Sequence, residues 1–153
     1  MNRKTCTPGI NIIKQSESCR LKAYLCPAGK WTIGYGHTGA DVSPGMIITQ
    51  ARAEELLLKD LAEAERGVNL LVKSFINQNQ FDALVSFAFN CGTDIDTDLI
   101  AEGLGDSTLL KLVNANPHDI RIAGEFARWN KSKGIVLPGL TRRRASEAKL
   151  YFS

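Results

Sequence analysis

The apolar positions of this chain follow a helical period over most of its length. A long helix is predicted from about residue 49 to residue 72, with Thr49 as its N-cap. Its apolar stripe consists of Leu57, Leu61, Ala64, Val68 and Leu71. A second helix follows the spacing i, i+3, i+4, i+7, i+8 and ends at Gly92 as its C-cap. Its predicted core residues are Phe81, Leu84, Val85, Ala88 and Phe89.

Shorter helices are predicted on both sides of these two. Pro8 and Gly9 open a helix that has Ile10 and Ile13 on one face, with Glu17 one turn further. Three more helices are predicted over residues 108–114, 117–129 and 138–152. Residues 93–106 form an acidic, glycine-bearing stretch that predicts a loop, and residues 131–136 predict a second loop.

The pattern changes between residues 20 and 39, where prolines and glycines separate short aromatic and β-branched runs. This pattern is typical of a small hairpin or meander. It places Glu17 near a helix C-terminus, Cys26 near a turn and Thr32 on a strand. The elements together predict an α+β fold that is mostly helical.

Composition limits the class of protein. The chain has 153 residues, of which 44% are hydrophobic and 23% charged, as expected for one soluble globular domain. The net charge of +3 is modest, and the only dense basic run is Arg142-Arg143-Arg144. This run predicts either a solvated helix face or a binding role for an anionic polymer.

No apolar stretch approaches the roughly 20 residues that span a bilayer. The N-terminal segment also lacks the apolar core of a secretory signal. We therefore expect no membrane segment and no export route of the chain's own.

The four cysteines are Cys6, Cys19, Cys26 and Cys91, and they form no C-x-x-C pair. With only two histidines available as further ligands, we expect no metal site. The glycines near residue 36 do not open a helix as a dinucleotide-binding turn would, so no cofactor is expected.

Glu17, Cys26 and Thr32 lie in the segment E-S-C-R-L-K-A-Y-L-C-P-A-G-K-W-T-I-G-Y-G-H-T. The order Glu, eight residues, Asp or Cys, five residues, Thr resembles the catalytic signature of the phage-type lysozymes (endolysins, glycoside hydrolase family 24). Residues 79–92, 107–115 and 139–147 are also similar to this family. The resemblance covers nearly the whole chain in the expected order.

This resemblance implies a single lysozyme domain over residues 1–153. A small β-lobe with the first helix (about 8–48) would be joined by a linking helix (about 49–72) to a helical lobe (about 73–153). The implied activity is that of a muramidase, which hydrolyses the β-1,4 bond from N-acetylmuramic acid to N-acetylglucosamine in peptidoglycan and so lyses the host cell.

The catalytic roles follow from the resemblance and from the chemistry of each residue type. Glu17 is the expected general acid. Cys26, as a thiolate, would act as a base, stabilise positive charge on the sugar or serve as nucleophile. Thr32 would hold the attacking water. Arg143 is expected to pair with Glu17, and His37 to have a supporting role in packing or in pairing with an acid.

The glycines beside Thr32 have two interpretations. Gly34 and Gly36 either let sugar rings approach the backbone or provide tight turn geometry.

The implied partner is peptidoglycan polysaccharide rather than nucleic acid, and the implied state is a monomer. The resemblance also implies residence in the host cytoplasm until holin-dependent release, followed by action on the cell wall in the periplasm. Some relatives begin with a signal-anchor segment, so a truncated form of such a protein is the alternative.

Some family members use cysteines in this region to hold an inactive form. By this resemblance, a regulatory disulfide between Cys19 and Cys26 is possible, with Cys6 as the exchange partner that attacks Cys19. The alternative is four reduced cysteines.

Two other functions remain open at this stage. One is a Cys26-dependent amidase or peptidase that cuts peptide cross-links with His37 as its base. The other is a wall-binding module without catalytic activity.

Overall fold

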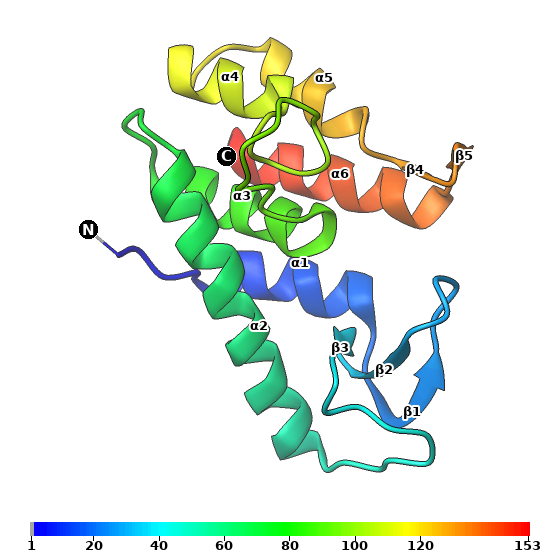
Figure 1. The fold of residues 1–153 in the computed structure, drawn as a ribbon. Coiled ribbons are helices and arrows are strands. Elements are labelled where there is room, and N and C mark those ends of the chain that lie inside the picture. The colour runs from blue at the N-terminus through cyan, green and yellow to red at the C-terminus, as the bar shows by residue number, and fades with distance from the viewer. Residues whose placement is uncertain (1) are drawn as a thin grey trace.

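A long helix, α2, connects a small sheet with a bundle of shorter helices (Figure 1). The computed structural model describes residues 2–153. The helices are α1 (Thr7–Glu17), α2 (Gln50–Leu71), α3 (Gln78–Cys91), α4 (Thr108–Ala115), α5 (Arg121–Ala127) and α6 (Pro138–Tyr151). The strands are β1 (Arg20–Leu25), β2 (Trp31–Gly34), β3 (His37–Thr38), β4 (Lys131–Ser132) and β5 (Ile135–Val136). The predicted α+β, mostly helical fold is confirmed.

The main sheet is antiparallel, with the strand order β1-β2-β3. After β1 the chain turns tightly, because the Cys26 N–H donates to the Lys30 carbonyl (2.9 Å) and the Gly29 N–H donates to the Cys26 carbonyl (2.8 Å). On β2, Thr32 pairs with Tyr24 of β1. The predicted meander, with Cys26 at a turn and Thr32 on a strand, is therefore confirmed.

The connecting helix α2 begins where its sequence predicts. The Thr49 hydroxyl accepts a hydrogen bond from the Arg52 N–H (3.1 Å) and so caps the helix. Four residues of the predicted stripe are buried, and Leu71 is partly buried. Because α2 packs against β2, β3 and α3, this one stripe joins the sheet to the helical lobe.

Helix α3 is the centre of the helical lobe and packs against α1, α2 and α6. Asn77 and Gln80 form a capping box at its start, and Gly92 ends it with a φ of +96°. Its predicted core residues are buried with one exception. Phe89 is only partly buried, because it lines a hollow between α2 and α3.

Two predictions for the C-terminal part were wrong. The helix predicted over residues 117–129 is shorter, since the side chains of Asn116 and Asp119 accept hydrogen bonds from the N–H groups of His118 (3.0 Å) and Arg121 (2.9 Å) and hold this stretch in turns. The loop predicted over residues 131–136 is a hairpin of β4 and β5. Its two turn residues have positive φ, which suits a two-residue hairpin.

Among residues 2–153, none of the helices combines the length and the apolar character needed to cross a bilayer.

The N-terminus of α1 is held by a buried carboxylate of α3. The Asp82 carboxylate accepts hydrogen bonds from the N–H groups of Cys6 (3.1 Å) and Gly9 (3.4 Å). Cys6, the N-cap residue, provides no side-chain cap of its own. Burial raises the pKa of Asp82, and the hydrogen bond from the Cys6 N–H opposes this rise. Asp82 thus replaces the missing cap of the helix that carries Glu17.

We expect Asp82→Ala to lower the free energy of unfolding by about 2 kcal/mol, because it leaves the buried Gly9 N–H and the part-buried Cys6 N–H without this acceptor. Urea denaturation followed by circular dichroism measures this change. The exposed Glu102→Ala serves as the control and should change the same quantity by less than about 0.5 kcal/mol. Equal stability of the two variants would contradict this role of Asp82.

Candidate active site

Glu17 is the last residue of α1, and its side chain is 21% exposed. The helix ends there because Ser18 has a positive φ (58°) and an extended ψ (166°). The Arg143 Nη1 lies 2.5 Å from the Glu17 Oε1, so the predicted pairing is present in the register expected from the sequence. Arg143 itself is buried and comes from α6, 126 residues further along the chain.

Gly36 packs against the other oxygen of the Glu17 carboxylate. A Cβ atom added to Gly36 would lie 2.7 Å from the Glu17 Oε2, and the φ of Gly36 is +78°. Gly34 also has positive φ (+64°), in keeping with the turn interpretation of these glycines. At Gly36 the group that approaches the backbone closely is the Glu17 carboxylate.

We therefore expect Gly36→Ala to displace Glu17 and to strain the backbone, lowering the free energy of unfolding by about 1 to 2 kcal/mol. The rate of glycan hydrolysis should fall by about tenfold or more, since catalytic geometry tolerates little displacement. Gly45→Ala is the matched control, because Gly45 has nearly the same φ (+77°) and no atom within 4 Å of the added Cβ. If both variants lose activity equally, contact with Glu17 is not the cause.

Cys26 lies in the turn between β1 and β2 and is partly buried. A hydrogen bond from the Lys30 backbone is the largest influence that lowers the pKa of the Cys26 thiol. The Ala28 backbone, the Thr32 hydroxyl and the Lys30 charge also lower this pKa, and burial opposes them. The turn therefore favours the thiolate form of Cys26.

Thr32 is 3% exposed, and its hydroxyl donates to the Lys30 carbonyl at 3.0 Å. The same turn therefore orders Cys26 and Thr32 through Lys30. The Thr32 hydroxyl has one proton. Directed at the Lys30 carbonyl, this proton leaves the lone pairs of the oxygen available to accept a hydrogen bond, and turned toward Cys26 it stabilises the thiolate.

Two hollows lie in the region of Glu17. One, of about 730 Å³, is lined by Glu17, by Pro27 beside Cys26, and by Asn90, Leu140 and Arg142 among others. The other, of about 330 Å³, is lined by Gly36 and Thr38 of the β-lobe and by residues of α2 and α3. Glu17 thus lines the larger hollow and contacts Gly36, which lines the smaller one.

His37 is buried between two carboxylates. Its Nδ1 lies 2.7 Å from the Asp60 Oδ2, and its Nε2 lies 3.1 Å from both oxygens of Asp41. The hydrogen bond with His37 is the main cause of the lowered pKa of Asp41. The expected pairing with an acid is thus present, and neither ring nitrogen is free to serve Cys26 as a base.

Cys6, Cys19, Cys26 and Cys91 are all free thiols in this structure. Cys19 and Cys26 stand at opposite ends of the six-residue strand β1, which is extended. A disulfide requires Cα atoms within about 7 Å, whereas six extended residues span about 20 Å. A Cys19–Cys26 disulfide would therefore require β1 to refold, and it stays a prediction.

The basic run of α6 is not a solvated face at two of its three positions. Arg143 is 4% exposed and Arg144 is fully buried, and both contact the buried carboxylate of Glu147. Sequence reasoning missed Glu147. The spacing of an acid three and four residues after two arginines could have indicated it, since such residues lie side by side on a helix.

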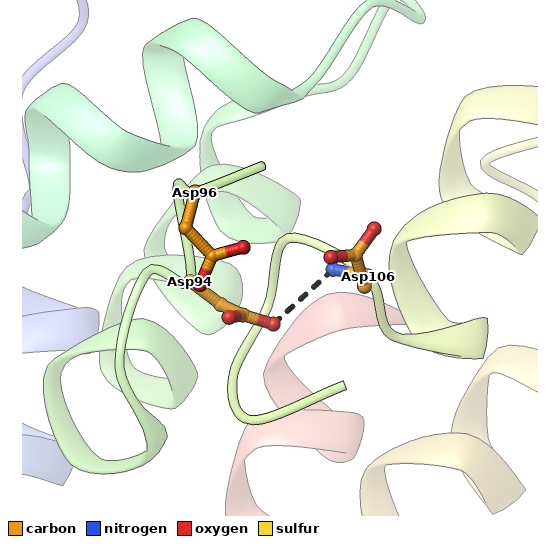
Figure 2. Close-up of side chains that lie close together, drawn as sticks. All are labelled: Asp94, Asp96 and Asp106. Atoms are coloured by element: carbon orange, nitrogen blue, oxygen red, sulfur yellow. Dashed lines mark hydrogen bonds between the residues drawn. The ribbon is translucent and has the colours of Figure 1, made fainter. Parts of the chain in front are cut away.

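Three acidic side chains of the loop after α3 come close together, namely Asp94, Asp96 and Asp106 (Figure 2). The Asp94 Oδ2 accepts hydrogen bonds from the N–H groups of Glu102 (3.0 Å), Gly103 (3.2 Å) and Asp106 (3.4 Å). Asp94 therefore holds the loop closed through backbone amides of the loop itself.

Comparison with known proteins gives a consistent result. Residues 14–147 match the sequence model of the family described as phage lysozyme. The chain is 46% identical over 147 residues to an endolysin of Bacillus phage B103. The aligned region covers 95% of this chain and 52% of that protein. The chain thus spans about half the length of this relative.

Solved structures agree over nearly the full chain. The muramidase domain of SpmX from Asticaccaulis excentricus is 38% identical, with a TM-score of 0.84 and 99% of each chain covered. The active form of the P1 phage endolysin Lyz is 29% identical, with a TM-score of 0.82 over 99% of this chain and 86% of that one. The secreted inactive form of Lyz has a TM-score of 0.62 at 28% identity, over 97% of this chain and 96% of that one. The fold described here is therefore closer to the active form of that protein.

Proposed function

Because the chain belongs to the phage lysozyme family, we propose that it is a muramidase that hydrolyses the β-1,4 bond between N-acetylmuramic acid and N-acetylglucosamine in peptidoglycan. The observation that carries this proposal is the position of Glu17. Its carboxylate packs on Gly36, pairs with Arg143 and lines the hollow of about 730 Å³. A glycan strand placed in this hollow would bring a glycosidic oxygen to a carboxyl group that can donate a proton.

In the proposed reaction, Glu17 donates its proton to the leaving glycosidic oxygen as the bond from that oxygen to the anomeric carbon breaks. The sugar then carries positive charge, which the Cys26 thiolate stabilises. A water molecule that donates a hydrogen bond to the Thr32 hydroxyl attacks the anomeric carbon and passes a proton to Cys26. The turn at Lys30 supports these two roles, because it favours the thiolate and orders the Thr32 hydroxyl.

The biological setting is part of the same proposal. The protein would act as a monomer on the cell wall of a bacterial host and lyse that cell for phage release. It would stay in the host cytoplasm until a holin opens the membrane.

Digestion of purified peptidoglycan, with mass analysis of the fragments, tests this function. A muramidase releases new reducing ends without new amino groups. New amino groups without reducing ends would instead indicate a Cys26-dependent peptidase or amidase. Pelleting of the protein with peptidoglycan without any released fragment would indicate a wall-binding module.

A further inference from the structure

Buried charged side chains next to Glu17 form a group between α3 and α6, made of Arg143, Arg144 and Glu147. At its centre Glu147 is fully buried. The Glu147 Oε1 accepts hydrogen bonds from the Ser86 hydroxyl (2.7 Å), the Arg144 Nη2 (2.9 Å) and the Arg143 Nε (3.3 Å). The Glu147 Oε2 lies 2.8 Å from the Arg144 Nε, an ion-pair contact outside hydrogen-bond geometry. None of these atoms is part of the reaction proposed above.

The contacts of Arg143 tie this group to the active site. The Arg143 Nε donates to Glu147, its Nη2 donates to the Ser86 carbonyl (3.2 Å), and its Nη1 contacts Glu17. A guanidinium is planar and rigid, so two anchored nitrogens fix the direction of the third. Glu147 and the Ser86 carbonyl therefore determine the direction of the Arg143 Nη1, which donates a hydrogen bond to Glu17.

The charges of the group balance. Two carboxylates, Glu17 and Glu147, face two guanidiniums, Arg143 and Arg144. Burial raises the pKa of Glu147, whereas the guanidiniums of Arg144 and Arg143 lower it. Because both oxygens of Glu147 contact guanidinium nitrogens and arginine stays charged, the ionised form of Glu147 fits this geometry.

Few other titratable or charged groups face this centre. From α3, the Cys91 Sγ lies 2.6 Å from the Arg144 Nη1, and burial raises the pKa of this thiol and favours its neutral form. From α6, Arg142 lines the larger hollow beside Glu17. From α1, Lys14 pairs with Glu54 of α2. Glu147 and Glu17 are thus the two carboxylates that contact Arg143.

We propose that Glu147 is a positioning residue for hydrolysis, which holds Arg143 in place and offsets its charge so that Glu17 keeps the proton it donates. This inference rests on the proposed function, with Glu17 as the general acid. Its physical basis is that a nearby cation favours the ionised form of a carboxyl group, whereas a general acid must be protonated when the substrate is bound. Because the negative charge of Glu147 offsets part of the positive charge of Arg143, Arg143 can orient Glu17 while Glu17 stays protonated.

The test compares rate–pH profiles of wild type and Glu147→Gln on solubilised peptidoglycan at constant ionic strength. Glutamine keeps the shape of the side chain and removes its charge. We expect the alkaline limb of the kcat profile to move to lower pH by about one unit, while KM stays within about twofold. Glu55→Gln is the matched control, since Glu55 forms an exposed ion pair with Arg52, and its profile should be that of wild type. A folded Glu147→Gln with the wild-type limb would overturn the inference.

Glu147→Asp provides a second test if the glutamine variant does not fold. The shorter side chain draws the carboxylate away from the Arg143 Nε, its longest contact at 3.3 Å, and retains the charge. We expect a smaller shift of the alkaline limb in the same direction, again with little change in KM, and an unshifted limb would overturn the inference. Glu17→Gln, measured in parallel, separates the two proposals. Undiminished release of reducing ends by that variant would refute the role of Glu17 as general acid, on which this inference rests. Loss of activity in Glu17→Gln beside a wild-type profile for Glu147→Gln refutes only the role of Glu147.

Discussion

We expect Glu17→Gln to lower the rate of glycan hydrolysis by at least about two orders of magnitude, because it removes the general acid. The amide has the shape of the carboxyl group and cannot donate the proton that the leaving oxygen needs. We expect the fold to persist, because the glutamine carbonyl can still accept from the Arg143 Nη1. Arg143 also keeps its contacts with Glu147 and the Ser86 carbonyl.

The measurement is the release of reducing ends from purified peptidoglycan, combined with thermal unfolding of each variant. Glu55→Gln removes an exposed carboxylate and serves as the control, with wild-type activity expected. A folded Glu17→Gln that releases reducing ends at a near-normal rate would show that Glu17 is not the proton donor.

The second large effect concerns Cys26. We expect Cys26→Asp to remain active and Cys26→Ser to lose about two orders of magnitude in rate, because serine has no ionisable group near neutral pH. By the resemblance given above, aspartate is the alternative to cysteine at this position of the motif. The turn that favours a thiolate, through the Lys30 backbone and the Thr32 hydroxyl, should also favour a carboxylate.

The direction of the pH effect follows from the group that ionises. The base form of Cys26 appears as pH rises through the pKa of the thiol, which the turn lowers. A carboxyl group ionises at a lower pH than a thiol, so Cys26→Asp should move the acidic limb of the rate–pH profile to lower pH. Activity of Cys26→Ser equal to wild type, together with an inactive Cys26→Asp, would contradict the role of an ionised group here.

Local sequence patterns were enough to predict the elements that carry the site. The apolar period and the caps of α2 and α3 set the positions of these helices, since each pattern acts within a few residues of itself. The glycines and prolines of residues 20–39 predicted the sheet for the same reason. The hairpin of β4 and β5 was missed because its turn begins with Lys133 at positive φ, which is uncommon for a residue with a Cβ.

The residues of the catalytic motif could be identified from the sequence because they lie within sixteen positions of one another, at a spacing that resembles a known family. Their surroundings depend on contacts between distant segments. The partner of Glu17 on one side is Gly36, and its partner on the other is Arg143, which lies on the last helix. Pairing of Glu17 with Arg143 was expected from the resemblance alone, since no local pattern links the two.

What the sequence by itself determined is the long helices, the first sheet, the family resemblance and the candidate acid, because periodicity, capping and motif spacing are properties of neighbouring residues. Only the tertiary structure decided which arginines are buried, that Gly36 makes room for a carboxylate, and that Glu147 stands behind Arg143. An arginine in a basic run has the same local sequence whether it faces water or a buried acid. The difference arises when α3 and α6 pack together and remove the arginine and the acid from solvent. Each buried charge then needs a counter-charge close to it.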